Sequence, residues 1–380
     1  MRRALLVLLA ALYLLTGCTG GQEIESCLFV LALSVDPAPD GNLTLTVKAL
    51  SGTQNPPSAS SNGEDGTEDI EPGYIVLSAT APSCLRAFDL LSATTPRSVN
   101  LSQLREVVLN RTLAETDAAL SILKEIHAMF RANGEAVVVV TPGNAGDFIR
   151  RQHAILGLRL SKYLEFLFEH FQSLDIIPPR PNLSAVLAAM QSGTIDAAAV
   201  YAAGNDFEAP LLLPEASDTD RLPGHLPRTA PAQNEYMGAA LFDGARMTTV
   251  LTGDEAGLLC LMTGRAQTRT TVLDGAQYQA VTRARVKRRI AADGALEVLI
   301  RMRLTLTAGE QTKTESELAA QIAAGCENLL RKMQAASSDA AGFGRLFIRR
   351  CVDVPAWETS GWDAFYDAAP IRVSVDVKIQ

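Results

Sequence analysis

The chain has 380 residues, of which 47% are apolar, and its formal net charge is −8. This length exceeds one ordinary hydrophobic core, so two or three domains are expected. The acidic balance disfavours nucleic acid as a partner, and no stretch after the N-terminal region is long and apolar enough for a transmembrane helix.

Residues 1–17 have the pattern of an export signal. Arg2 and Arg3 precede the apolar run 4–15, which rises only about 18 Å as a helix and is too short to span a bilayer. Leu15-Thr16-Gly17-Cys18 matches the bacterial lipobox, in which the cysteine thiol receives a diacylglycerol and becomes the new N-terminus. We therefore predict lipidation at Cys18 by acyl chains such as palmitate, with residues 18–26 as a lipidated leash. The alternative is an ordinary signal peptide with a chance cysteine.

Alternating strand and helix patterns fill residues 27–202, which we predict to be an N-terminal domain, with a division into two subdomains left open. The Ser-, Gly-, Pro- and acid-rich stretch 51–73 has too few apolar side chains to form a core and predicts a mobile surface loop. The periodicities predict strands at 27–35, 43–50, 74–80, 103–110, 135–141 and 194–201, and helices at 82–93, 113–131, 144–152, 160–174 and 182–192.

Residues 203–235 contain five prolines and keep neither a helical nor a strand period, which predicts a Pro-rich linker. Residues 236–380 then predict a C-terminal domain. It contains hairpins with turns at Asp243-Gly244 and Asp293-Gly294, the second joining strands 277–290 and 295–307. A helix follows the capping box Thr314-x-x-Glu317. In the last strand, 371–379, apolar residues alternate with polar or charged ones throughout.

The expected fold class is therefore α+β in several domains. A mixed sheet with helices is expected in the N-terminal part, and an antiparallel sheet packed on helices in the C-terminal part.

The standard catalytic and metal-binding constellations are absent from the sequence. It has no G-x-S-x-G elbow, no H-E-x-x-H and no Walker loop, and its four histidines fall in no ligand spacing. We therefore expect no enzyme activity, catalytic residue, cofactor or metal site. The remaining cysteines are interpreted as buried thiols, with one disulfide left open: Cys27, Cys84, Cys260, Cys326 and Cys351.

Two further features have both a structural and a functional interpretation. Trp357 and Trp362 are interpreted as core packing near the terminal sheet. A run of basic side chains indicates either a solvated sheet face that discourages edge pairing or a surface for anionic lipid or an acidic partner. These side chains are Arg283, Arg285, Lys287, Arg289, Arg301 and Arg303.

The closing part of the chain resembles the final block of the Ger(x)C spore germination family, the C-subunit lipoproteins of nutrient germinant receptors. The matching residues are Gln334, Asp339, Gly342-Phe343-Gly344, Trp357, Trp362 and Phe365, followed by the alternating strand. Segments upstream are similar to the same family in the same order, among them 236–264 and Glu23-Ile24-Glu25 after Cys18. Thr19-Gly20 stand where the family usually has Trp-Asp.

This resemblance implies a mixed α+β fold and a protein anchored through Cys18 to the extracytoplasmic face of the spore inner membrane. It implies two integral-membrane partners, the A- and B-type germinant receptor subunits, and a non-catalytic role in nutrient-triggered germination. The alternative is a lipid-anchored solute-binding protein of a transporter, suggested by residues 190–201. That alternative predicts two similar α/β lobes joined by a hinge around a ligand cleft.

Overall fold

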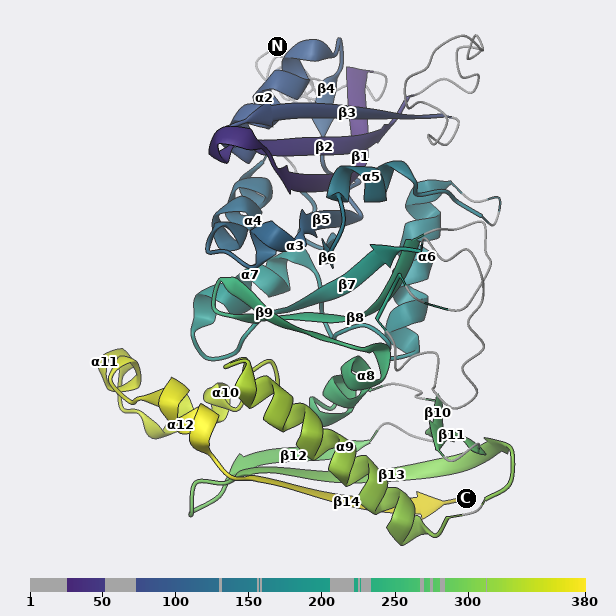
Figure 1. Cartoon of the computed structure of the whole chain (residues 1–380), viewed down its shortest axis with the longest axis vertical. Helices are drawn as coiled ribbons and strands as arrows, with labels where there is room; N and C mark the ends of the chain where they lie inside the picture. Colours follow the sequence, from purple (N-terminus) through teal and green to yellow (C-terminus); the bar gives the residue numbers. More distant parts are fainter. Residues whose placement is uncertain are drawn as a thin grey trace, which may run out of the picture.

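The computed structural model contains two β-sheets placed one beyond the other along the longest axis of the molecule (Figure 1). We call them the N-terminal sheet, built from β1 to β9, and the C-terminal sheet, built from β10 to β14. The structure describes residues 26–51, 73–129, 132–155, 157, 159–205, 222–224, 226, 234–266, 270–273, 276–280, 284–311 and 313–380.

The N-terminal sheet is parallel at its centre and antiparallel at both edges. Its order is β3-β2-β1-β5-β6-β7-β8-β9, with β4 paired to the start of β1. β1, β5, β6 and β7 run parallel, and they are buried on both faces, as continuous apolar runs such as Val137–Thr141 require. The strands are β1 (Cys27–Pro37), β2 (Leu43–Leu50), β3 (Tyr74–Ala81), β4 (Ser98–Asn100), β5 (Glu106–Asn110), β6 (Val137–Thr141), β7 (Ala198–Gly204), β8 (Asn234–Asp243) and β9 (Arg246–Leu251).

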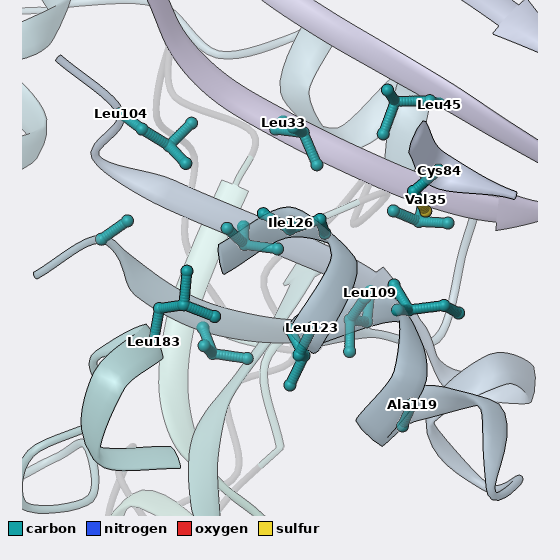
Figure 2. Close-up of a cluster of buried hydrophobic side chains, with 14 of the residues drawn as sticks. Leu33, Val35, Leu45, Cys84, Leu104, Leu109, Ala119, Leu123, Ile126 and Leu183 are labelled. Atoms are coloured by element: carbon teal, nitrogen blue, oxygen red, sulfur yellow. The ribbon is translucent and has the colours of Figure 1, made fainter. Parts of the chain in front are cut away.

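Helices cover both faces of this sheet and bury a separate hydrophobic cluster on each. One cluster joins the sheet to α2, α4 and α7, and Figure 2 shows part of it, with Leu33, Leu109 and Ile126 among the labelled side chains. The other joins the opposite face to α5 and α6 through Phe148 and Phe168. The helices are η2 (Pro39–Gly41), α2 (Cys84–Thr94), α3 (Arg111–Ala114), α4 (Ala118–Ala128), α5 (Ala145–Arg150), α6 (Leu160–Ser173) and α7 (Leu183–Ser192).

The C-terminal sheet has β13 at its centre. β11 and β12 pair antiparallel with successive parts of β13, and β14 lies along its other side. The helices α8 and α9 pack on one face, where Leu259, Leu329 and Val298 share a core. The elements are α8 (Gly253–Met262), β10 (Thr270–Leu273), β11 (Ala276–Ala280), β12 (Arg285–Ile290), β13 (Leu296–Ala308), α9 (Glu315–Ala335), α10 (Gly344–Phe347), η3 (Ile348–Arg350), α11 (Val354–Glu358), α12 (Trp362–Ala368) and β14 (Ile371–Ile379).

The α+β class is confirmed, and one detail of the C-terminal sheet differs from the expected antiparallel arrangement. β14 runs parallel to β13, with Leu296 opposite Ile371 and Leu304 opposite Ile379. Parallel neighbours need a long crossover between them. Here α9 to α12 form that crossover, so the chain returns to the start of β13 before β14 begins.

Several element boundaries also differ from those expected. The helix expected at 113–131 is divided into α3 and α4, because Asn110 caps α3 and the Thr116 hydroxyl bonds the carbonyl of Leu113 at its end. The strand expected at 277–290 is divided into β11 and β12. The strand expected from residue 194 begins at Ala198, after Gly193 ends α7 in the left-handed conformation.

The N-terminal sheet includes strands from both sides of the predicted linker. β8 and β9 form the predicted hairpin at Asp243-Gly244, and β8 pairs antiparallel with β7. All of residues 1–25, residues 52–72 of the predicted loop and most of residues 203–235 lie outside the described residues. The predicted domain boundaries therefore stay a prediction.

Candidate functional site at the junction of the two sheets

The predicted lipidation site, Cys18, lies outside the described residues, as do the predicted signal peptide and nearly all of the predicted leash. The other five cysteines form no disulfide with one another. Four are buried as predicted, and Cys351 is half-buried. Burial raises the pKa of the Cys84 thiol to about 12, and the nearby Glu125 carboxylate adds to the shift, so this thiol is held in its neutral, unreactive form.

Asp196 and Asp339 link the two sheets where they meet. Asp196 lies between α7 and β7, and Asp339 lies between α9 and α10. The backbone N–H of Asp339 donates to Oδ2 of Asp196 over 2.7 Å, and the N–H of Asp196 donates to the carbonyl of Asp339 over 3.3 Å. Oδ1 of Asp196 accepts from the N–H of Gly244 in the β8–β9 turn over 3.0 Å. We call this arrangement of three segments the junction clasp.

The carboxylate of Asp339 shapes the turn that follows α9. It accepts the N–H groups of Phe343 at 2.9 Å and Gly344 at 2.6 Å. Gly342, directly before these two residues, takes a positive φ of 75°. The sequence predicts a sharp turn at these glycines, and the structure confirms it. Because Asp339 is buried, its two oxygens replace water for the backbone of the turn.

Both carboxyl groups of the junction clasp have raised pKa values. Burial raises the pKa of Asp339 to about 7 against the opposing hydrogen bonds from Gly344 and Phe343, and the charge of Asp196 adds to the rise. Burial also raises the pKa of Asp196 to about 6, with further contributions from the charges of Asp243 and Asp363. The junction clasp therefore changes its charge in the range just below neutral pH.

The other residues that resemble the family's final block have structural roles. Nε2 of Gln334 donates to the carbonyls of Tyr366 at 2.6 Å and Ala369 at 2.9 Å, which holds the end of α12 against α9. Phe347 lies 6.1 Å from Trp357 and 5.1 Å from Trp362 between ring centroids. Trp362 is buried as predicted, whereas Trp357 is half-buried.

A second buried polar network lies inside the N-terminal sheet. Glu106 of β5, Gln152 and Tyr236 of β8 bond one another, with the Tyr236 hydroxyl 3.1 Å from Oε2 of Glu106 and 2.7 Å from Nε2 of Gln152. Nζ of Lys48 in β2 donates to the carbonyl of Gln152. Burial raises the pKa of Glu106 to about 7, which the hydrogen bonds and the Lys48 charge oppose. No local sequence pattern predicts this network, because its members come from four separate segments.

The predicted basic side chains lie together on the outward face of the C-terminal sheet. Arg285, Lys287 and Arg289 of β12 are exposed, and the exposed Arg301 pairs in register with Arg285. This face also carries acids, since Glu297 binds Arg289 and Asp376 lies 4.0 Å from Arg301. Arg283 lies outside the described residues. Both interpretations of the basic face remain open.

The part of the chain that the structure describes contains no helix with the length and apolar character needed to cross a bilayer. Within the same residues, no group of three or more His, Cys, Asp or Glu side chains is arranged to hold a metal ion.

Comparisons with known proteins identify the same family along nearly the whole chain. Residues 20–203 match the model described as spore germination protein N-terminal domain, and residues 237–380 match the model described as spore germination B3/GerAC like, C-terminal. No curated protein matches the chain.

One similar solved structure is the crystal structure of the GerBC protein. It has 13% sequence identity and a TM-score of 0.53, over 91% of this chain and 96% of that chain. At this identity the likeness shows a shared fold. The fold and the two family models agree, and the chain belongs to the Ger(x)C family of spore germination proteins.

Proposed function

We propose that this protein is the lipid-anchored, non-catalytic subunit of a membrane germinant receptor complex and is needed for nutrient-triggered spore germination. The observation that carries the proposal is the match of both germination-family models, in order, over residues 20–203 and 237–380. The lipobox Leu15-Thr16-Gly17-Cys18 directly before the first matched residues supports the anchor. The proposed partners are two integral-membrane subunits of A and B type in the spore inner membrane.

The position of the first described residues gives the proposed anchor an orientation. β1 begins at Cys27 beside β4, at the end of the molecule opposite the C-terminal sheet (Figure 1). A leash of residues 18–26 spans at most about 30 Å when fully extended. An anchor at Cys18 therefore keeps the β1–β4 end near the membrane and directs the basic face of the C-terminal sheet away from it. This arrangement favours an acidic partner over lipid for that face.

The solute-binding alternative fits the architecture poorly. It requires two similar α/β lobes, whereas the two sheets differ in strand order and in the helices that cover them. The helix-to-strand stretch at residues 190–201, which suggested the alternative, here supplies Asp196 to the junction clasp.

The proposal is tested in spores that lack the gene and carry either the intact gene or a Cys18→Ala variant. We expect the deletion to abolish release of core solutes in response to one class of nutrient, and the intact gene to restore it. Cys18→Ala should restore little, because the chain is no longer held beside its membrane partners at high effective concentration. The matched control is Thr16→Ala, which changes the variable lipobox position and should restore the response.

Normal solute release from the deletion spores on every nutrient would contradict the receptor role. Full restoration by Cys18→Ala would leave the receptor role intact and contradict the need for an anchor. Incorporation of labelled palmitate into the intact protein, and its loss in Cys18→Ala, is the direct measurement of the modification.

A further inference from the structure

A cavity of about 270 Å³ opens beside the junction clasp, between α7 and the segment that connects α9 to α10. Its apolar wall comes from the alanines of α7 and from Leu259 of α8. Its charged wall comes from Arg180, Arg265, Arg288 and Arg345, and Asp196 is the single acid among the described residues that line it.

The four arginines belong to segments that are far apart in the sequence. Arg180 precedes α7, Arg265 follows α8, Arg288 lies on β12 and Arg345 lies in α10. The fold therefore brings like charges together at one cavity, an arrangement that costs free energy unless an anion offsets it.

Arg288 shows the effect of this crowding. Its guanidinium is half-buried, and its pKa is lowered by burial and by the charges of Arg345 and Arg265, with Asp339 opposing the shift. Within the described residues, neither the Arg288 side chain nor the Arg345 side chain makes a hydrogen bond or an ion pair. Both oxygens of Asp196 already accept backbone N–H groups, from Gly244 and Asp339.

The turn after α9 keeps Arg288 open to the cavity. Gly342 has a φ of 75°, and a Cβ at this position would lie 3.6 Å from Nη1 of Arg288 and 3.1 Å from Cδ1 of Ile195. A larger residue would narrow the space in front of the guanidinium.

We propose that this cavity binds a small organic anion, with its carboxylate or phosphate group on Arg288 and Arg345 and a short apolar part against the alanines of α7. The planar guanidinium matches such oxyanions through paired hydrogen bonds. The cavity volume of about 270 Å³ lies just below the usual range of ligand pockets, about 300–1,000 Å³, which fits a small anion better than a nucleotide or an intact lipid. The inference goes beyond the proposed function and does not depend on it.

The test is isothermal titration of the purified full-length protein, in a non-ionic detergent, with four probes. Valerate and propyl phosphate each combine an anionic group with a short apolar chain. Valeramide has the shape of valerate without its charge, and inorganic phosphate has the charge without the chain. We expect saturable one-to-one binding of valerate, propyl phosphate or both, and no saturation by valeramide.

Variants locate the binding in the cavity. Arg288→Gln and Arg345→Gln should each raise the dissociation constant roughly tenfold or more, as expected for the loss of one charge-assisted hydrogen bond. Arg349→Gln is the matched control, since Arg349 is exposed on η3 next to α10 and does not line the cavity. If Arg288→Gln impairs folding, the exposed Arg345 provides the test, with circular dichroism to verify the fold.

Three outcomes would overturn the proposal. The first is the absence of saturable binding of both organic anions in the millimolar range, including the case in which only inorganic phosphate binds. The second is equal affinity for valerate and valeramide. The third is a dissociation constant that Arg345→Gln leaves unchanged while the variant remains folded.

Discussion

At Gly344 the backbone of α10 lies against the backbone that precedes β7. A Cβ on this residue would lie 2.7 Å from the carbonyl oxygen of Thr194. The obstructing atom belongs to the main chain and moves only if the connection between α7 and β7 moves with it. We therefore expect Gly344→Ala to lower the free energy of unfolding by about 1–3 kcal/mol, measured by urea denaturation.

The control is Gly143→Ala. A Cβ on Gly143 would have no other atom within 4 Å, and Gly143 has no positive φ. Its unfolding free energy should change by less than about 1 kcal/mol, and a small gain is allowed. Equal losses of unfolding free energy in the two variants would show that the close approach to the Thr194 carbonyl does not explain the need for glycine at 344.

Single residues also show how far the sequence predicts the site. Gly342 and Trp362 behave as predicted, because a turn and a large apolar side chain give local signals. Asp339 is one of the residues that resemble the family's final block, but the sequence alone assigns it no physical role. Its role depends on Asp196, which is 143 positions away in the chain and beside it in the fold. No local pattern pairs two carboxylates at that separation, nor brings Lys48 to Glu106.

Among the helices, α9 begins at the capping box predicted from the sequence. Oγ1 of Thr314 accepts the N–H of Glu317 over 3.3 Å, and Oε2 of Glu317 accepts the N–H of Thr314 over 2.8 Å. α9 supplies Leu318, Ile322 and Leu329 to the core of the C-terminal sheet. Thr314→Ala should therefore lower the unfolding free energy by about 1 kcal/mol in urea denaturation, because the N–H of Glu317 loses its acceptor and the Glu317 carboxylate loses the Thr314 hydroxyl.

Ser316→Ala provides the matched control for the cap, since Ser316 is exposed in the first turn of α9 and lies beside the capping box. Its unfolding free energy should stay within about 0.5 kcal/mol of the original. A loss in Ser316→Ala as large as that in Thr314→Ala would show that the effect is not specific to the capping box.

Helices and strands were predicted correctly where a periodic pattern of apolar residues continued over many residues. The predictions failed where tertiary contacts determine the direction or the existence of an element. The alternation of 371–379 predicts β14, yet alternation contains no information about direction, which the crossover through α9 to α12 determines. β4 was missed because its three residues form a strand only through pairing with Cys27–Phe29.

Across the whole molecule, three buried carboxyl groups make stability depend on pH. Glu106 lies in the N-terminal sheet and Asp196 and Asp339 lie at the junction clasp, with pKa values raised to about 7, 6 and 7. Between about pH 4 and pH 7 the folded protein therefore binds more protons than the unfolded chain. Its stability is complete below the unfolded pKa values and is lost as the pH rises through the folded ones.

Exposed carboxylates oppose this trend only at lower pH. Arginine partners lower the pKa values of Asp293 and Glu297, so their contribution is lost as the pH falls below about 4. These pairs are at the surface and screened by solvent and salt. We therefore expect maximum stability near about pH 4 and a decrease of several kcal/mol by pH 7.5, since each pKa unit corresponds to about 1.4 kcal/mol.

The measurement is urea denaturation of the purified protein at intervals from pH 4.5 to pH 7.5, with Asp339→Asn and Asp89→Asn beside the original. Asparagine at 339 cannot ionise, so the stability of this variant should fall less steeply as the pH rises. The variant should also be less stable at low pH, because its amide nitrogen cannot accept one of the two N–H groups that Asp339 binds. Asp89 is exposed on α2, and its replacement should leave the slope unchanged. A stability that stays level or rises across this range in the original protein would show that the junction carboxyls are ionised in the folded state. Equal slopes in Asp339→Asn and the original would assign the dependence to the two remaining buried carboxyl groups, Glu106 and Asp196.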